Sequence, residues 1–435
     1  MVRSGSPFPE WLHLSTDSTD VDNLAIRNDG ASPWGLRDFR LVWVGGFVNN
    51  IGDWLLKIAL PVYVYIETGS GTATAVLFAV ELIVAVVLGP LGGSLVDRWD
   101  LRRTLIATNL AQAVALLPLI AVTADRVWPA IVVTTVQSAL AQLNNPANVA
   151  LLPRIVPTEH LTVANAANST SSSLARMVGA PLGGIVVGLG GLTSVVVVDG
   201  LTFLAVAVAT MMVRAQTAPI GDSFVLGQGD GGGVRAGFRV IRRHRPLPAL
   251  LGIVALGQLA QGFFLVLFVV FVIDRLRGTA TDVGLIRGTM AIGAIVSAIA
   301  ITKWARRADA GRLLGYGYLG MGIASLLFWN APEVTIALWL YLVLFAISGL
   351  PGAALEIGLM TTVQQRSPPE ALGRVVGTLG ACAAAGSALG SLLVGALVDH
   401  VRLAVLLQIE ASIYIVCGAL ALVVRGKQGD DSADR

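Results

Sequence analysis

Charged residues are scarce in this chain, and their scarcity excludes an ordinary soluble protein. Asp, Glu, Lys and Arg make up 13% of the 435 residues, whereas hydrophobic residues make up 55%. A soluble globular domain carries about 25% charged residues. Apolar segments long enough to cross a bilayer, which takes about 20 residues in a helix, recur along most of the chain. The composition therefore predicts a protein that crosses the membrane many times.

Cysteine and histidine are also rare, and several chemical functions are excluded with them. Cys382 and Cys417 both lie in apolar segments, where sulfur packs as a small hydrophobic group, so we expect no disulfide framework. The four His residues are scattered without the spacing of a ligand set, so we expect no metal site. We find no phosphate-binding loop, no Ser/His/Asp set and no paired catalytic carboxylates. The sequence therefore predicts neither an enzyme nor a bound cofactor.

Two passages in the chain match one another closely. Residues 71–74 and residues 278–281 both read Gly-Thr-Ala-Thr, and each opens a long apolar run that ends in a basic cluster. Residues 157–161, Pro-Thr-Glu-His-Leu, are echoed by residues 368–372, Pro-Pro-Glu-Ala-Leu, at nearly the same offset. Duplicated hydrophobic halves indicate a carrier whose two related units rock about a central cavity.

We expect an all-α membrane protein with about twelve transmembrane helices in two pseudo-symmetric six-helix bundles around a central cavity. The start of the chain is polar and acidic, unlike a cleavable signal peptide, and a Gly- and Arg-rich stretch near its middle is typical of a linker. The predicted segments are a disordered cytoplasmic tail (1–40), a first bundle (41–214), a cytoplasmic linker (215–246), a second bundle (247–424) and a cytoplasmic tail (425–435).

The distribution of arginine predicts the orientation in the membrane. Cationic loops stay on the cytoplasmic side, and placing both termini there puts most Arg and Lys residues in the cytoplasm. The arginines that this orientation places on or near the outer side are Arg126, Arg275, Arg277, Arg287 and Arg402. We expect a monomer in the plasma membrane, and we interpret the basic linker as a topology signal that contacts anionic lipid rather than nucleic acid.

Residues 93–103 form a short motif between the second and third predicted helices. They read Gly-Ser-Leu-Val-Asp-Arg-Trp-Asp-Leu-Arg-Arg, which resembles the signature loop of the major facilitator superfamily, and the resemblance extends over residues 38–424. Residues 50–53 (Asn-Ile-Gly-Asp) and the passage from residue 151 to residue 184 are similar to the branch that contains macrolide-efflux proteins and the enterobactin exporter. The resemblance implies drug:proton antiport.

The loop motif also has a physical interpretation. A glycine permits close helix approach, and an acid at a cytoplasmic helix end can pair with nearby arginines and hold an inner gate in one state. The gate candidates are Gly93, Asp97, Arg98, Arg102 and Arg103. The alternative is that the basic residues serve only as a topological signal.

Three charged residues in the first two predicted helices are candidates for proton coupling. Asp53 lies ~18 Å of helix rise beyond residue 41, near the middle of the membrane, and Lys57 follows one turn later on the same face. Glu81 enters from the outer side to a depth similar to that of Lys57, so the two can pair. A charge at this depth is costly and indicates function, although a static ion pair that fixes helix register is the alternative.

Polar side chains on otherwise apolar helices predict the substrate cavity. Residues 165, 168, 172 and 176 share one helical face, on which Arg176 could bind an anionic group of a substrate or neutralise Asp53. The cavity candidates are Asn49, Asn50, Gln137, Gln142, Asn145, Asn165, Asn168, Ser172, Arg176, Gln258 and Gln261. Hydrogen-bonded helix packing is the alternative role for such residues.

These observations together predict a secondary active transporter. We expect it to export a small amphipathic organic molecule, such as a drug-like compound, a siderophore or a metabolite, by alternating access driven by proton entry. A uniporter or an uptake carrier is the alternative within transporters. A non-transporting sensor or scaffold is the alternative of another class, but such proteins usually carry larger soluble regions than this chain has between its apolar segments.

Overall fold

The structure is a computed structural model. It describes residues 32–96, 99–214, 233–244, 247–304, 309–368 and 371–433. Within those ranges the backbone forms helices and connecting turns, apart from one isolated bridge between Thr123 and Arg126. This architecture confirms the all-helical prediction.

The first half of the chain supplies six membrane-length helices. They are α2 (Arg37–Thr68), α3 (Gly71–Val96), α4 (Leu101–Ala115) with η2 (Leu117–Ala121), α5 (Trp128–Ile155) and the two parts of α6 (Leu161–Met211), with η1 (Pro33–Gly35) and η3 (Thr158–His160) between them. Within α6, Gly191 adopts φ 63° and ψ −163°, a conformation that side chains disfavour. The chain reverses there, so α6 contains the fifth and the sixth helix of the bundle.

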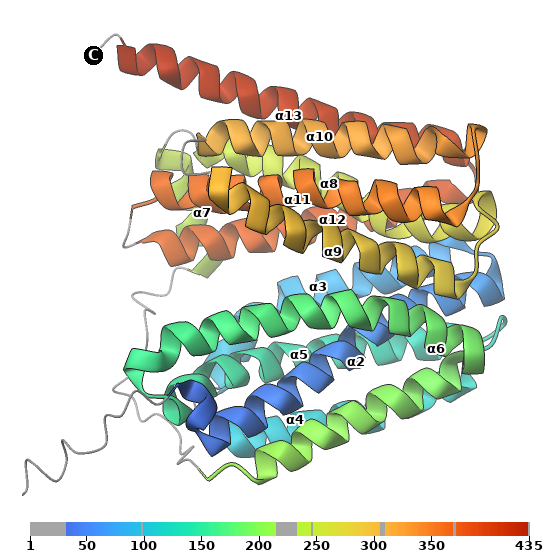
Figure 1. Cartoon of the computed structure of the whole chain (residues 1–435), viewed down its shortest axis with the longest axis vertical. Helices are drawn as coiled ribbons and strands as arrows, with labels where there is room; N and C mark the ends of the chain where they lie inside the picture. The colour runs from blue at the N-terminus through green and yellow to red at the C-terminus, as the bar shows by residue number, and fades with distance from the viewer. Residues whose placement is uncertain are drawn as a thin grey trace, which may run out of the picture.

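The second half repeats the arrangement. After the short α7 (Gly233–Arg243), its helices are α8 (Leu247–Val270) with the π-helical η4 (Phe271–Arg275), α9 (Ala280–Trp304), α10 (Ala310–Asn330) with η6 (Ala331–Glu333), α11 (Leu338–Arg366), α12 (Leu372–Val398) and α13 (Leu403–Ala433). Figure 1 shows the two sets of helices as two stacked groups with their axes roughly aligned. The predicted pair of six-helix bundles is therefore present.

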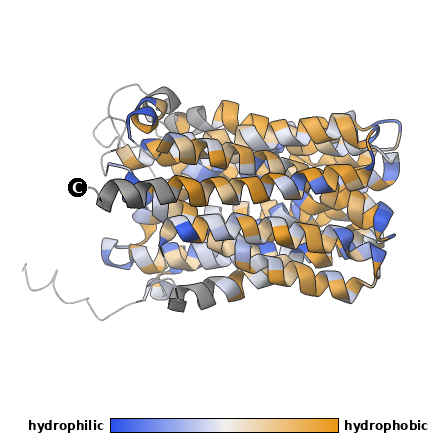
Figure 2. Cartoon of the chain, turned by 90° about the horizontal axis from the view of Figure 1, so that it is seen from above, coloured by the Kyte–Doolittle hydropathy of each residue, from blue (hydrophilic) through white to orange (hydrophobic). Residues whose placement is uncertain are grey.

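Hydrophobic side chains cover the flanks of the molecule. Figure 2 shows apolar residues along the sides of the bundles and polar residues gathered at the two ends. Among the described residues, eight segments are long and apolar enough to cross a membrane, and one of them contains both parts of α6. The helices α2, α5 and α10 are not among the eight, and charged and amide side chains interrupt the apolar runs of α2 and α5. Those interruptions mark the site described below.

One helix contact recurs in both bundles. In each half, two glycines one turn apart on the fifth helix lie against the backbone of the first helix, so closely that an added Cβ would collide with a carbonyl oxygen. The glycines and the residues that carry these oxygens are Gly179 with Ile51, Gly183 with Leu55, Gly386 with Ala255 and Gly390 with Leu259. Small residues of this kind allow helices to pack tightly in lipid. The contact is a structural counterpart of the sequence repeat.

The two bundles are hydrogen-bonded to one another at one end of the molecule. We call the end where α2 begins the first end, and the end where α2 stops and α3 begins the opposite end. At the opposite end, the Asp399 carboxylate accepts from Gly71 N at 3.2 Å and from Thr72 Oγ1 at 2.8 Å. The Tyr65 hydroxyl donates to Asp274 Oδ2 at 2.5 Å. These bonds join residues more than 200 positions apart in the sequence.

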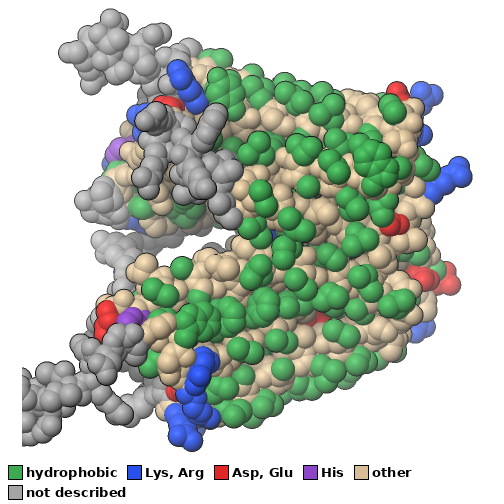
Figure 3. All heavy atoms as spheres, viewed as in Figure 1, with side chains coloured by type: hydrophobic (Ala, Val, Ile, Leu, Met, Phe, Trp, Pro, Cys, Tyr) green, Lys and Arg blue, Asp and Glu red, His purple; other side chains and the backbone are tan. Residues whose placement is uncertain are grey.

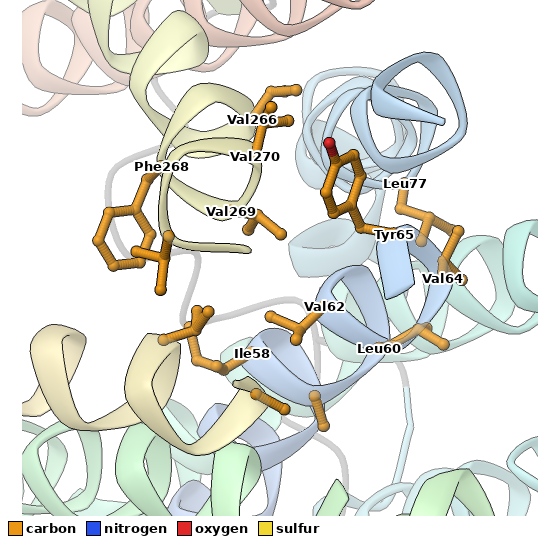
Figure 4. Packing of buried hydrophobic residues seen from close by; sticks show 14 of the residues in the cluster. Ile58, Leu60, Val62, Val64, Tyr65, Leu77, Val266, Phe268, Val269 and Val270 are labelled. Carbon is orange, nitrogen blue, oxygen red and sulfur yellow. The ribbon is translucent and has the colours of Figure 1, made fainter. Parts of the chain in front are cut away.

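A hydrophobic seam lies beneath these hydrogen bonds. Figure 4 shows Val62 and Tyr65 of α2 facing Val266, Val269 and Val270 of α8, and all five residues are buried in one apolar cluster. At the first end, by contrast, the space-filling view shows the surface hollowed between the two halves (Figure 3). The structure is therefore closed at the opposite end and open at the first end.

Candidate functional site

A polar cavity of about 630 Å³ lies within the first bundle. Its lining on α2 runs from Val42 near the first end to Pro61, and it includes residues of α3, α4, α5 and both parts of α6. Ligand sites for drug-sized molecules have volumes of about 300–1,000 Å³. The cavity is therefore large enough for a small organic molecule, and it reaches from the first end to beyond the middle of α2.

The three proton-coupling candidates meet in the wall of this cavity. Lys57 Nζ lies 2.7 Å from Glu81 Oε1, in the ion pair that helix depth predicted. The side chains remain 47% and 35% exposed, which shows that the pair borders open space rather than packed protein. Asp53 also lines the cavity, and its Oδ2 accepts a hydrogen bond from Asn49 Nδ2 at 3.2 Å. The lysine therefore pairs with Glu81, and Asp53 keeps an amide partner.

The polar face of α6 forms another wall. Asn165, Asn168 and Ser172 line the cavity and are exposed to it, as their common helical face predicted. Arg176 follows one turn after Ser172, and its guanidinium lies over the ring of Trp54, with Cζ 5.6 Å from the centroid. The Lys57 ammonium contacts the same ring at 5.5 Å. Trp54 and Arg176 are not among the residues that line the cavity, so Arg176 lies beside it, on the same aromatic ring as the cavity residue Lys57.

A buried network of amides connects α4 and α5 beside the cavity. Asn144 Nδ2 donates to Gln112 Oε1 at 3.0 Å and to Asn109 Oδ1 at 3.3 Å. Gln137 Nε2 donates to the Gln112 carbonyl at 2.9 Å. Asn109 and Gln112 were not among the sequence candidates, although their spacing of three places both on one face of an apolar helix. The network fixes the positions of its four amides, and all four line the cavity: Asn109, Gln112, Gln137 and Asn144.

The remaining predicted cavity residues divide between two places. Asn50, Gln142 and Asn145 line the cavity. Gln258 and Gln261 lie in the second bundle, outside it. Gln258 Oε1 accepts from the Ser387 hydroxyl at 2.9 Å, and Gln261 Oε1 accepts from the Tyr414 hydroxyl at 3.2 Å. These two amides therefore hold α8 against α12 and α13. Their role is hydrogen-bonded helix packing, the alternative to lining the cavity.

The gate candidates can be placed only in part. Asp97 and Arg98 lie outside the described residues, as do the surroundings of Gly93 within α3. Arg102 donates from Nε to the Thr210 carbonyl at 3.2 Å and from Nη2 to the Met211 carbonyl. Arg103 N donates to Asp100 Oδ1 at 2.8 Å, which caps α4. Arg102 thus satisfies carbonyls at the end of α6, a favourable position for a cation.

Two fully buried acids are not among the candidates named from the sequence. Asp199, on the second part of α6, accepts from Thr202 Oγ1 at 3.3 Å and packs beside Gly52, the neighbour of Asp53. Glu410, on α13, accepts from Trp329 Nε1 at 2.9 Å. The sequence does contain a signal for them, because an acid inside an apolar helix is costly. The position of an acid along its helix, however, does not show how completely its side chain is buried.

Arg287 also takes a different place from the one the sequence indicated. Arginine distribution placed it on or near the outer side of the membrane. The structure places it within α9, with its guanidinium Cζ 5.0 Å from the Phe264 ring centroid and 5.1 Å from that of Phe268. It lies ~10 Å of helix rise beyond the start of α9. Aromatic rings stabilise the charge there, so the side chain need not extend to the membrane surface.

Comparison with known proteins identifies the family. Residues 42–278 and 250–434 match the Major Facilitator Superfamily. The chain is 24% identical over 377 residues to the macrolide efflux protein A of Streptococcus pyogenes, covering 85% of this chain and 91% of that protein. It is 25% identical over 381 residues to the enterobactin exporter of Shigella boydii serotype 18, covering 82% and 85%.

A solved structure has the same fold. A bacterial homologue of the iron transporter ferroportin, in an inward-facing state, superposes with a TM-score of 0.69 at 16% identity, covering 89% of this chain and 98% of that one. The family match spans both bundles and includes the residues that form the cavity. This chain is therefore a membrane transport protein of the Major Facilitator Superfamily.

Proposed function

We propose that this protein exports a small amphipathic organic molecule from the cytoplasm in exchange for protons, by alternating access. The names of two relatives, a macrolide efflux protein and an enterobactin exporter, support export. In this proposal the proton gradient supplies the energy, so no bound cofactor is needed. The two bundles of one monomer form the complete transport path.

The first end is the cytoplasmic end in this proposal. Arg102, Arg154, Arg242, Arg312 and Arg366 all lie at or near helix ends on that side, and cationic segments are retained in the cytoplasm. Both chain termini are then cytoplasmic. The structure, hollowed at the first end and sealed at the opposite end, then corresponds to the inward-facing state.

The observation that carries the proposal is the placement of Asp53 beside the Lys57–Glu81 ion pair in the wall of an open polar cavity. A cavity for solute and a charged group in the middle of the membrane are the two parts that coupled transport requires. Here both parts occur at one site, so proton binding and solute binding can influence one another directly.

Lys57 supplies the switch. Its ammonium pairs with Glu81 and also interacts electrostatically with Asp53, one turn away on α2. One lysine cannot fully neutralise two carboxylates, so the acid that lacks the lysine is the better proton acceptor. Movement of Lys57 from Glu81 to Asp53 while the cavity is open to the cytoplasm would release the Asp53 proton there, and return of Lys57 to Glu81 would let Asp53 take a proton from outside. The proton gradient then biases the direction in which the cavity opens.

The test measures solute uptake into inside-out vesicles, with a pH-sensitive dye reporting proton release. We expect Asp53→Asn to abolish solute-driven proton flux and gradient-driven uptake, while leaving insertion and exchange of solute intact. Glu67→Gln is the matched control, because Glu67 is an exposed acid on the same helix. Full gradient-driven uptake by Asp53→Asn would overturn the role of Asp53, and uptake that persists with an uncoupler would favour a uniporter.

A charge exchange separates the switch from a static ion pair. The double variant Lys57→Glu with Glu81→Lys keeps an ion pair but moves the cation from α2 to α3. If the pair only fixes helix register, the double variant regains transport lost in the single variants. If Lys57 alternates between Glu81 on α3 and Asp53 on its own helix, the double variant folds and binds solute but remains uncoupled.

A further inference from the structure

Two arginines from different bundles lie beside the contact between α6 and α9. Arg176 lies on the first part of α6 and Arg287 on α9, each next to a residue through which these helices touch. The helix backbones bring them together, because Gly288 packs against Pro181 and against the carbonyl oxygen of Met177, the residue after Arg176. Placing two positive charges near one another is unfavourable unless a group of opposite charge binds between them.

Neither arginine has an acidic partner within the described part of the chain. The ion pairs found there are Lys57 with Glu81 and Arg37 with Asp38. Arg176 contacts the ring of Trp54, and Arg287 contacts two phenylalanine rings. Aromatic rings hold a guanidinium in place by contact with its face, and they leave the N–H groups at its edge free to donate. The two cations are therefore held in position without being neutralised.

The arginines lie at the closed end of the space between the bundles. From the opposite end inward, α6 and α9 touch through small residues, from Gly184 against Ala280 to Gly288 against Met177. Arg176 and Arg287 adjoin the last of these contacts. Arg176 lies one turn beyond Ser172 on the exposed face of α6, just outside the residues that line the cavity. Beside this contact Arg176 is exposed and Arg287 is half-buried, so both side chains are accessible.

We propose that Arg176 and Arg287 together bind an anionic group of the transported molecule, so that the substrates of this protein are amphipathic organic anions bearing a carboxylate, sulfonate or phosphate group. This inference rests on the transport function proposed above. A guanidinium fork matches the geometry of such oxyanions, and the half-buried Trp54 ring provides apolar surface beside the Arg176 charge.

The site also explains how binding affects conformation. Each bundle contributes one arginine, so an anion placed between them contacts both bundles at once. Without the anion, repulsion between the guanidinium groups opposes close approach of α6 and α9 at this point. With the anion bound, that repulsion is replaced by attraction to a shared partner. A ligand that interacts differently with two arrangements of the bundles shifts the population between them.

The test uses two dyes with the same xanthene ring system, fluorescein as the organic anion and rhodamine 123 as the organic cation. Binding is measured by fluorescence anisotropy with the full-length protein in nanodiscs of zwitterionic lipid. We expect fluorescein to bind the wild type, and Arg176→Gln and Arg287→Gln each to weaken it about ten- to a hundredfold, the loss typical of a charge-assisted hydrogen bond. Rhodamine 123 should bind equally well or better.

Two controls make the result specific. Arg176→Lys and Arg287→Lys keep the charge and should retain part of the fluorescein affinity, because lysine lacks the guanidinium fork. Arg402→Gln removes an exposed arginine at a helix start and should change nothing. Retained rhodamine 123 binding and an unchanged size-exclusion profile show that each variant is folded.

Several outcomes would overturn the anion site. Fluorescein affinity that is equal in the wild type and in both glutamine variants would do so, as would failure of the wild type to bind fluorescein. Displacement of fluorescein by phosphatidylglycerol added to the nanodiscs would assign the site to lipid headgroups instead. If the wild type exports rhodamine 123 in an Asp53-dependent manner and ignores fluorescein, the export function stands and only the anion site is refuted.

Discussion

Removal of the Asp399 carboxylate should open the seal at the opposite end. Asp399 is exposed, belongs to the second bundle and accepts two hydrogen bonds from the first turn of α3 in the first bundle. The carboxylate also lies at the N-terminus of α3, where a negative charge is favourable. Because these contacts exist only while the bundles touch there, their loss in Asp399→Ala destabilises this state selectively.

The size of the effect follows from the two hydrogen bonds. Each contributes about 0.5–1.5 kcal/mol net, so the sealed state loses about 1–3 kcal/mol relative to the state open at that end. This corresponds to a shift of roughly 5–150-fold in the ratio of the two states. Asp399→Asn keeps an acceptor oxygen and should lose only the charge–dipole interaction, about 0.3–1 kcal/mol. The predicted order of opening is therefore Ala, then Asn, then wild type.

Distances across the opposite end measure this ratio. Spin labels at Arg126 of the first bundle and Arg402 of the second, both exposed, report it by double electron–electron resonance after replacement of Cys382 and Cys417. We expect Asp399→Ala to increase the long-distance population and the wild type to favour the short one.

A matched control and a clear refutation are available for this experiment. Asp125→Ala removes another exposed acid from a loop at the same end and should leave the distance distribution unchanged. If Asp399→Ala changes the population ratio by less than twofold, the hydrogen bonds to α3 do not hold the seal. The apolar seam between α2 and α8 would then have to account for closure by itself.

Three further outcomes test the packing and the polar network. Gly183→Leu should abolish the folded peak in size-exclusion chromatography, since the new side chain would collide with the backbone of α2. Gly46→Leu should be tolerated, because an added Cβ at Gly46 meets no other atom. Asn144→Ala should lower the free energy of unfolding by about 1–3 kcal/mol, because it leaves buried amides without partners, and should therefore lower the melting temperature. The control Asn145→Ala, at an exposed amide, should leave the melting temperature unchanged. Equal melting temperatures for the two variants would contradict the network's role. Tyr65→Phe removes a hydrogen bond between the bundles and should shift the distance distribution in the same direction as Asp399→Ala; a shift toward the closed state would refute the seal.

The sequence by itself determined the helices and their division into two bundles. Transfer of an apolar stretch into lipid depends on its length and composition and needs no knowledge of its neighbours. The repeated Gly-Thr-Ala-Thr passages indicated that the second half copies the first. Depth along a helix also follows from residue count, which is why Lys57 and Glu81 could be matched before their ion pair was seen.

Only the tertiary structure decided which polar side chains share a cavity. Gln137 and Gln258 look alike in sequence, since both are amides in apolar helices, yet one lines the cavity and the other binds Ser387. The rotation of each helix about its axis decides this, and that rotation is set by the glycine contacts with neighbouring helices. The meeting of Arg176 with Arg287 and the seal at Asp399 depend on the same packing, because both join residues that are far apart in the chain.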